Sequence, residues 1–322
     1  MNTILGLFHL LLAFAAAPFL LTVINRTKAL FAGRVGPPWF QPYYDLWKLL
    51  GKGAVYSQTT SWVFRAGPIV GLSSITLALM LVPFGSSPAL LAFPGDLLLF
   101  AYLLGLARLF TVLAAMDTGS AFEGMGASRE VQFSALAEPA LLLGLATVAR
   151  AAVTQESLGQ LTQGVAATIP LARLSLSSIH EALTFSVWVK SSLVLVLVGV
   201  TLIVVMLLEN SRIPVDDPNT HLELTMIHEV MVLDHGGPDL AFILYGQALK
   251  LWLLGTLVLE TLLPINIGFF PLDTVLSLSA LLVLAILVGV IESTMARLRL
   301  LRIPQMLVGA TALAAVAFLL ER

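Results

Sequence analysis

The sequence of 322 residues contains no cysteine and few charged residues. Without cysteine, the chain cannot form a disulfide or hold an iron–sulfur cluster through thiolates, so any such redox centre that it serves must belong to another subunit. Charged residues make up only 11% of the chain and apolar residues 58%, and the mean hydropathy is +0.95. These values lie outside the range of soluble domains and predict an integral membrane protein.

Long apolar runs define the fold class. A helix needs roughly 18 to 20 apolar residues to cross a bilayer core, whereas an outer-membrane barrel would show alternation over strands of about ten residues. The runs therefore predict an all-α, polytopic protein with a single membrane domain, and we find no internal repeat or low-complexity tract. The eight predicted spans are Ile4–Ile24, Pro68–Phe84, Leu97–Met116, Val131–Val153, Phe185–Leu208, Leu240–Leu263, Thr274–Ile291 and Ile303–Leu320.

The basic residues predict the orientation of these spans. They gather after the first and seventh spans, whereas the loops around Pro88 and Pro264 have neither lysine nor arginine. The positive-inside rule places the basic loops in the cytoplasm and both termini outside. No cleavable signal is predicted at the first span, because it lacks a basic leader. The basic residues are Arg26, Lys28, Arg34, Lys48, Lys52, Arg65, Arg297, Arg299 and Arg302.

Two loops are predicted to carry short amphipathic helices. After the first span, Tyr43, Leu46, Trp47 and Leu50 recur at helical spacing beside Lys48. This pattern favours a helix on the membrane surface, either as an interfacial anchor or as a docking surface for another subunit. The loop between the fourth and fifth spans is expected to lie outside and to carry no chemistry.

Ionisable residues within the spans are functional candidates, because charges inside a bilayer are costly. We expect Arg108 to pair with Asp117 or to reach the interface, and a similar interfacial role for Arg150 and Lys190. We favour a functional role for Glu138 and Lys250, since the short carboxylate side chain of Glu138 cannot reach the membrane interface. The candidates are Arg108, Glu138, Arg150, Lys190, Lys250, Glu260 and Glu292.

The stretch "ENSRIPVDDPNTHLELTMIHEV", residues 209–230, concentrates acids and histidines between two apolar runs. Prolines interrupt the helix, and Asn219 or Thr220 is expected to cap a new one. The stretch has neither an H-E-x-x-H motif nor a close histidine pair, so its sequence does not favour a metal site. The chain also lacks a G-x-S-x-G or phosphate-loop motif, which disfavours a nucleophile-based hydrolase. Clustered carboxylates and histidines favour a proton relay, with a solvated loop face as the alternative.

Four motifs resemble one known family over nearly the whole chain. The stretches "GRVGPPWFQPYYDLWKLL", "GASREVQFSALAEPALLL", "ENSRIPVDDPNTHLELTMIHEVMVLDHGGPDLA" and "IESTMARLRLLRIPQ" are similar to the complex I subunit 1 family. Within it, they most resemble the membrane subunit of group 4 energy-converting [NiFe]-hydrogenases and formate hydrogenlyases. In the respiratory branch, glutamates stand at the positions of Asn219 and His221.

The resemblance implies an eight-helix subunit of a prokaryotic cytoplasmic membrane that binds no cofactor itself and no nucleic acid. Its expected partners are the hydrogenase large and small subunits, an iron–sulfur subunit, antiporter-like membrane subunits and the lipid bilayer. The [4Fe-4S] clusters and the NiFe centre belong to those partners.

The resemblance also implies roles for particular residues. In the family, the matching positions of five residues belong to an acidic proton pathway, namely Glu138, Glu209, Arg212, Asp216 and Glu223. By their position we add Glu229, Lys250, Glu260 and Glu292. The expected docking surface for the cytoplasmic arm comprises Arg34, Gln41, Asp45, Lys48, Arg129, Asp217, His221 and His228.

Three alternatives remain open from the sequence. A quinone-site subunit of respiratory complex I, or of a related oxidoreductase, would need a cavity lined by the first span, the amphipathic helix and the sixth span. A stand-alone transporter would show inverted repeats. A purely structural anchor would use none of the buried carboxylates. The sequence does not distinguish H⁺ from Na⁺ as the coupled ion.

Overall fold

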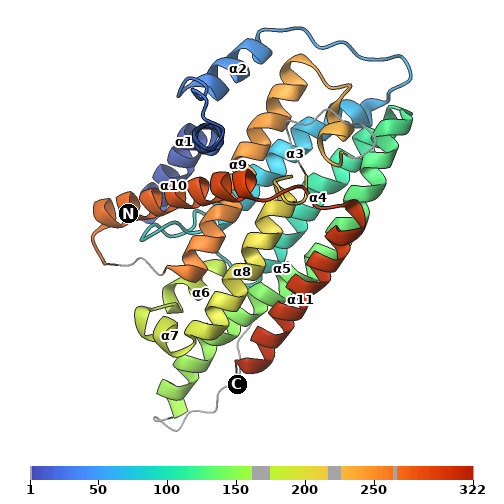
Figure 1. Cartoon of the computed structure of the whole chain (residues 1–322). Coiled ribbons are helices and arrows are strands. Elements are labelled where there is room, and N and C mark those ends of the chain that lie inside the picture. The colour runs from blue at the N-terminus through green and yellow to red at the C-terminus, as the bar shows by residue number, and fades with distance from the viewer. Residues whose placement is uncertain (1, 162–174, 217–225, 264–266, 322) are drawn as a thin grey trace.

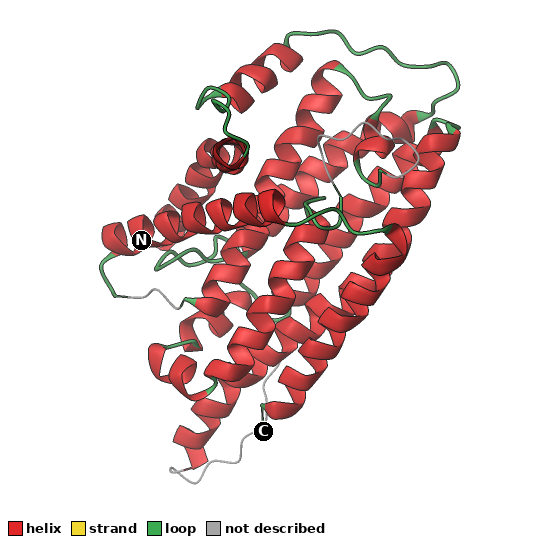
Figure 2. Ribbon diagram, viewed as in Figure 1, coloured by secondary structure: helices red, strands yellow, loops and turns green. Residues whose placement is uncertain are grey.

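The structure is a computed structural model that describes residues 2–161, 175–216, 226–263 and 267–321. These residues form helices joined by loops, with no β-strand among them (Figure 2). Eight helices are long and apolar enough to cross a membrane, which confirms the predicted all-α, polytopic fold. They are α1 (Asn2–Phe31), α3 (Trp62–Leu81), α4 (Asp96–Asp117), α5 (Ala121–Leu161), α8 (Ser192–Glu209), α9 (Gly237–Leu262), α10 (Phe270–Thr294) and α11 (Ile303–Leu320).

Several of these helices begin or end some residues away from the predicted spans, as at the end of α1 (Phe31 rather than Ile24), and two differences change the local structure. The predicted fifth span, Phe185–Leu208, was wrong as one continuous helix, because it divides into α7 (Phe185–Lys190) and α8 at Ser191. The Ser191 hydroxyl donates to Glu321, in keeping with the preference of serine for helix ends. Helix α5 begins at Ala121 rather than Val131, so the residues before the predicted fourth span, Glu130 among them, already lie on a helix.

The amphipathic helix predicted after the first span is present as α2 (Gln41–Leu50). None of its residues is buried within the chain, and Tyr44 and Trp47 are exposed. The Tyr43 hydroxyl donates to the Ala15 carbonyl of α1 at 2.5 Å, which ties α2 to the bundle. In Figure 1, α2 lies at one end of the molecule, whereas α6 (Leu176–Ala182), α7 and the C-terminus lie at the other.

The segment after α8 departs from the predicted helix. Residues 217–225, which include Asn219, lie outside the described residues. Met226 to His228 are not helical, and only the short 3₁₀ helix η2 (Glu229–Val232) follows. The Asp216 carboxylate accepts the N–H groups of Ile227 and His228 at 3.0 and 3.1 Å, so these groups have a partner without a helical turn.

Helix α9 forms the centre of the bundle and packs against α1, α2, α3, α8 and α10. Its Trp252 is fully buried. Helices α1 and α10 approach closely at Gly289, where an added Cβ would lie 2.7 Å from Thr27 Cβ and 3.0 Å from the Ile24 carbonyl oxygen. This glycine therefore sets the separation of the two helices.

We predict that Gly289→Ala destabilises the protein by about 1–3 kcal/mol, because the added methyl group overpacks the contact between α1 and α10. Gly309→Ala is the matched control, since no atom lies within 4 Å of its added Cβ. Thermal unfolding in detergent should show a lower Tm for Gly289→Ala only. An unchanged Tm would mean that α1 and α10 do not pack at this distance.

Candidate functional site

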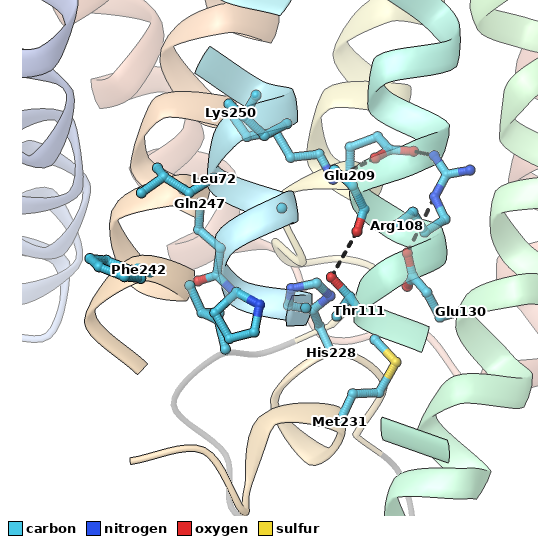
Figure 3. Close-up of a pocket in the computed structure, with 17 residues that line it drawn as sticks. Leu72, Arg108, Thr111, Glu130, Glu209, His228, Met231, Phe242, Gln247 and Lys250 are labelled. Carbon is cyan, nitrogen blue, oxygen red and sulfur yellow. Dashed lines mark hydrogen bonds and ion pairs between the residues drawn. The ribbon is translucent and has the colours of Figure 1, made fainter. Parts of the chain in front are cut away.

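The candidate site centres on Arg108, a buried cation in α4 that faces three carboxylates. Its guanidinium lies 2.6 Å from Glu138 and 3.7 Å from Glu130, and it also contacts Glu209. On the other side of Glu209, the Lys250 ammonium lies 2.6 Å from the second carboxylate oxygen. Figure 3 shows Glu209 between Arg108 and Lys250. If all five groups are ionised, three negative charges meet two positive ones.

Local structure places each member of this Arg108 cluster. Glu130 and Glu138 are eight residues apart on α5, a little over two turns, so both face Arg108. Glu209 is the last residue of α8, where Ser211 adopts a positive φ of 52° and turns the chain. Because Glu209 is at a helix end and Lys250 is in the middle of α9, the cluster joins four helices.

The members differ in exposure. The side chain of Glu209 is 3% exposed and that of Arg108 is 10% exposed. The Glu138 side chain, in contrast, is 52% exposed. Charges this deep in a protein are stable only when they are paired. The cluster thus runs from a buried carboxylate to one that reaches the lateral surface of α5.

A cavity of about 60 Å³ adjoins the cluster. It can hold a few waters, since one water needs roughly 10–15 Å³ by this measure. Its polar lining comes from α4, α5, α8, α9 and the segment before η2, and its walls include Leu72, Met231 and Phe242 (Figure 3). The polar lining residues are Arg108, Thr111, Glu130, Glu209, His228, Gln247 and Lys250.

His228 faces this cavity. Burial, followed by the positive charge of Lys250, lowers the pKa of His228 to about 4. The imidazole is therefore neutral at pH 7 and has one nitrogen free to accept a proton. His228, which we expected on the docking surface, is partly buried and lines the cavity with Glu209 and Lys250.

A second group of charges lies where α1, α10 and the segment after α8 meet. Glu292 pairs with Lys28 at 2.7 Å and with Arg212 at 3.3 Å. Asp216 pairs with Arg297 at 2.8 Å. Arg212 is thus paired with a carboxylate, and Asp216 and Glu292 are paired with cations, that lie outside the Arg108 cluster.

The other predicted residues are scattered. Among the docking candidates, Arg34 and Lys48 are exposed, the Gln41 amide donates to Asp45 at 2.8 Å, and Arg129 donates to the Met226 carbonyl at 2.7 Å. Glu229 begins η2. Asp217, His221 and Glu223 lie outside the described residues.

Glu260 lies at the far end of α9, where it pairs with His180 of α6 at 2.6 Å. His180 lies in the loop between the fourth and fifth predicted spans, which we expected to carry no chemistry. The Asp96 carboxylate accepts from Ser175 and Leu176 and fixes the start of α6 against α4.

Sequence reasoning missed the central role of Arg108. The expected pairing with Asp117 was wrong, since Asp117 accepts the backbone N–H groups of Ser61 and Phe64. The sequence feature that could have predicted the pairing is that Arg108 and Glu138 are opposite charges within consecutive predicted spans. Within the described part of the chain, no group of three or more His, Asp or Glu side chains is placed to hold a metal ion.

Comparisons with known proteins agree with this architecture. A family model described as NADH dehydrogenase matches residues 3–321. Formate hydrogenlyase subunit 4 of Escherichia coli K12 is 29% identical over 309 residues, which cover 93% of this chain and 92% of that protein. Hydrogenase-4 component C of the same organism is 28% identical over 307 residues, covering 94% of this chain and 90% of that protein.

A solved structure has the same fold. A chain of the membrane-bound sulfane sulfur reductase, an archaeal respiratory membrane complex, matches with a TM-score of 0.75. The match covers 100% of this chain and 99% of that chain at 22% sequence identity.

We predict that Arg108→Met destabilises the protein by about 3–5 kcal/mol, because it leaves the carboxylates of a buried cluster without their shared cation. Adding Glu209→Gln should restore part of this loss by removing the most buried negative charge. Lys48→Met, at an exposed position of α2, is the control. Thermal unfolding of the wild type, Arg108→Met, the double variant and Lys48→Met tests the prediction. Equal stability of Arg108→Met and Lys48→Met would contradict it.

Proposed function

The chain belongs to the NADH dehydrogenase family, and from this membership we propose that it is the membrane-anchoring and ion-coupling subunit of a complex of the [NiFe]-hydrogenase or formate hydrogenlyase type. The two Escherichia coli relatives support this assignment, because each aligns over more than nine-tenths of the chain. The absence of cysteine fits a subunit whose redox centres lie in its partners.

The observation that carries the coupling proposal is the buried Arg108 cluster. Protonation of one carboxylate removes a negative charge that Arg108 and Lys250 help to balance, so the proton affinities of the remaining carboxylates change with it. Such groups titrate as one unit. A change of charge near the cluster therefore shifts its proton occupancy without any redox chemistry in this chain.

We propose that this change originates in the cytoplasmic arm and acts through the segment from Glu209 to η2. Asp216 holds the N–H groups of Ile227 and His228. His228 in turn lines the cavity beside Glu209. Displacement of the segment by the arm would move the imidazole and the water in the cavity. Glu223, outside the described residues, belongs to the same proposal by its place in the sequence.

We propose that the ion leaves the Arg108 cluster laterally, through Glu138. Its carboxylate contacts Arg108, yet about half of its side chain is exposed on α5. An exposed carboxylate within a bilayer needs a polar partner. We propose that an antiporter-like membrane subunit covers this face and receives the ion.

A quinone-site subunit is the weaker assignment. The cavity beside Glu209 is lined from α3, α4, α5, α8 and α9, and it is lined by neither α1 nor α2. Its volume of about 60 Å³ is well below the roughly 300 Å³ at which pockets for drug-sized ligands begin. The cavity suits water better than a quinone head group.

The coupling proposal predicts that Glu209→Gln and Glu138→Gln separate redox turnover from ion movement. Each change removes a proton site, so proton movement in proteoliposomes of the whole complex should fall by about a hundredfold, the low end of what a positioned acid–base group contributes. Hydrogen evolution from a reduced donor should persist. Glu181→Gln, at an exposed carboxylate of α6, is the matched control.

Two results would contradict the proposal. If Glu138→Gln and Glu209→Gln both keep hydrogen turnover and coupled proton movement, the chain is a structural anchor. If the purified complex contains no nickel and evolves no hydrogen, the hydrogenase assignment fails and the oxidoreductase is of another kind.

The anchoring proposal predicts that charge reversal on α2 and in the loop before it weakens attachment of the arm. Lys48→Glu combined with Arg34→Glu should lower the amount of arm subunits that co-purify with the tagged chain, because both cations are exposed on the face predicted to be cytoplasmic. The control is Glu181→Gln, at the opposite end of the bundle. Full recovery of the arm with the double variant would place the docking surface elsewhere.

A further inference from the structure

His180, Glu260 and Gly85 form a closed ring of polar contacts at the end of α9 away from the Glu209 to η2 segment. The His180 Nδ1 atom lies 2.6 Å from Glu260 Oε2, and both side chains are 12% exposed. The His180 Nε2 atom lies 2.7 Å from the Gly85 carbonyl oxygen. The Gly85 N–H donates to Glu260 Oε1 at 2.9 Å. The ring joins α6, α9 and the loop after α3.

These contacts fix the number of protons. The Gly85 carbonyl can only accept, so Nε2 of His180 carries a hydrogen and donates it. One further proton must lie between Nδ1 and Oε2, because without it two lone pairs would face each other at 2.6 Å. The pair therefore holds one exchangeable proton, whether it is bound to the imidazole or to the carboxyl group.

The surroundings favour this protonated form. Burial lowers the pKa of His180, but the charge of Glu260 and the hydrogen bonds to Glu260 and Gly85 outweigh it and raise that pKa above its ordinary value. Glu181, exposed on α6, also raises it. Two other titratable groups lie nearby. The Asp273 carboxylate of α10 accepts hydrogen bonds from the N–H groups of Ile267 and Gly268. The His9 ring of α1 stacks on the Phe84 ring, with the ring centroids 4.8 Å apart.

A separate cavity of about 30 Å³ adjoins the ring. It has room for one or two waters, by the threshold of roughly 10–15 Å³ for each. Apolar side chains such as Leu145, Leu183 and Leu257 form most of its wall, and His180, Glu260 and Thr261 supply its polar side-chain atoms. A water in this cavity would find its strongest hydrogen-bond partners in the ring.

The ring lies on the face predicted to be outward. The segment from Val82 to Gly95, which contains Gly85, has neither lysine nor arginine, and the positive-inside rule places such a loop outside. Lys250 and Glu260 are ten residues apart on α9, or about 15 Å at 1.5 Å per residue. The ring is thus distinct from the Arg108 cluster.

We propose that His180 and Glu260 form a proton-exchange site on the outward side of the membrane. In the exchange, the proton between Nδ1 and Oε2 passes to water in the adjoining cavity and then to the outer medium. The Nε2 hydrogen stays on His180, where it is donated to the Gly85 carbonyl, and the pair changes from net neutral to a charge of −1. Uptake is the reverse. The exchange stands on the ring itself, whereas its use in coupling rests on the function proposed above.

Infrared difference spectra of the purified complex test the exchange. Histidine labelled with ¹³C identifies the imidazole bands, and the chain has only five histidines. Between about pH 5 and pH 8, where histidine titrates, we expect an imidazole band and a carboxyl band to change together. Both should disappear in E260Q and in H180Q and remain in E181Q, which removes an exposed carboxylate next to His180. Paired bands that survive E260Q or H180Q would overturn the proposal.

If E260Q and H180Q do not assemble, the labelled wild-type complex still decides the question. Paired bands that follow the pH of the outer bath in oriented proteoliposomes support the exchange. Bands that follow only the inner bath, or the absence of any paired change, overturn it.

Coupling is tested separately. In proteoliposomes, E260Q should lose proton movement by about a hundredfold and keep donor-driven turnover, while E181Q, which keeps the His180–Glu260 pair, should keep proton movement. Wild-type vesicles that move no protons would refute the proposed coupling function, and the infrared result would stand by itself. Wild-type and E260Q vesicles that move protons equally would refute the role of the ring in coupling.

Discussion

The interaction on which the site depends is the pairing of Arg108 with carboxylates from two other helices. A guanidinium buried in a bilayer protein is stable only among negative charges, and here these charges come from α5 and α8. Lys250 then balances Glu209 from α9. The four helices must therefore keep a particular rotation about their axes. The same requirement leaves a gap in the apolar packing, and this gap is the cavity beside Glu209.

Interruptions of regular structure supply the other groups. Helix α8 ends at Glu209, which lets a carboxylate lie at a helix end while the chain turns away at Ser211. Asp216 then satisfies backbone N–H groups that a helix would otherwise satisfy. Arg129 donates to the Met226 carbonyl, and the side chains of Met226 and Ile227 are buried in apolar clusters. Regular helices hold the charges, and the irregular segment before η2 is packed so that His228 lies beside them.

The fold was largely predictable because hydropathy and helical spacing are local properties. The eight spans and α2 follow from apolar runs and from the recurrence of aromatic residues around Trp47. The contacts of the site are not local. Arg108 and Glu209 are 101 residues apart in sequence, and hydropathy does not show which helices are neighbours. His180 was missed for the same reason, since its contact with Glu260 of α9 is equally non-local and the start of α6 is fixed by Asp96 of α4.

The two proposed proton sites, the Arg108 cluster and the His180–Glu260 pair, meet α9 at Lys250 and Glu260. Between Lys250 and Glu260 the helix buries Leu254, Leu257 and Val258, so the direct line between the sites is apolar. The hydroxyl of Thr256 is buried there and has no hydrogen-bond partner among the described residues, which offers one polar point for a transient water. An apolar barrier with one such point would prevent a continuous leak.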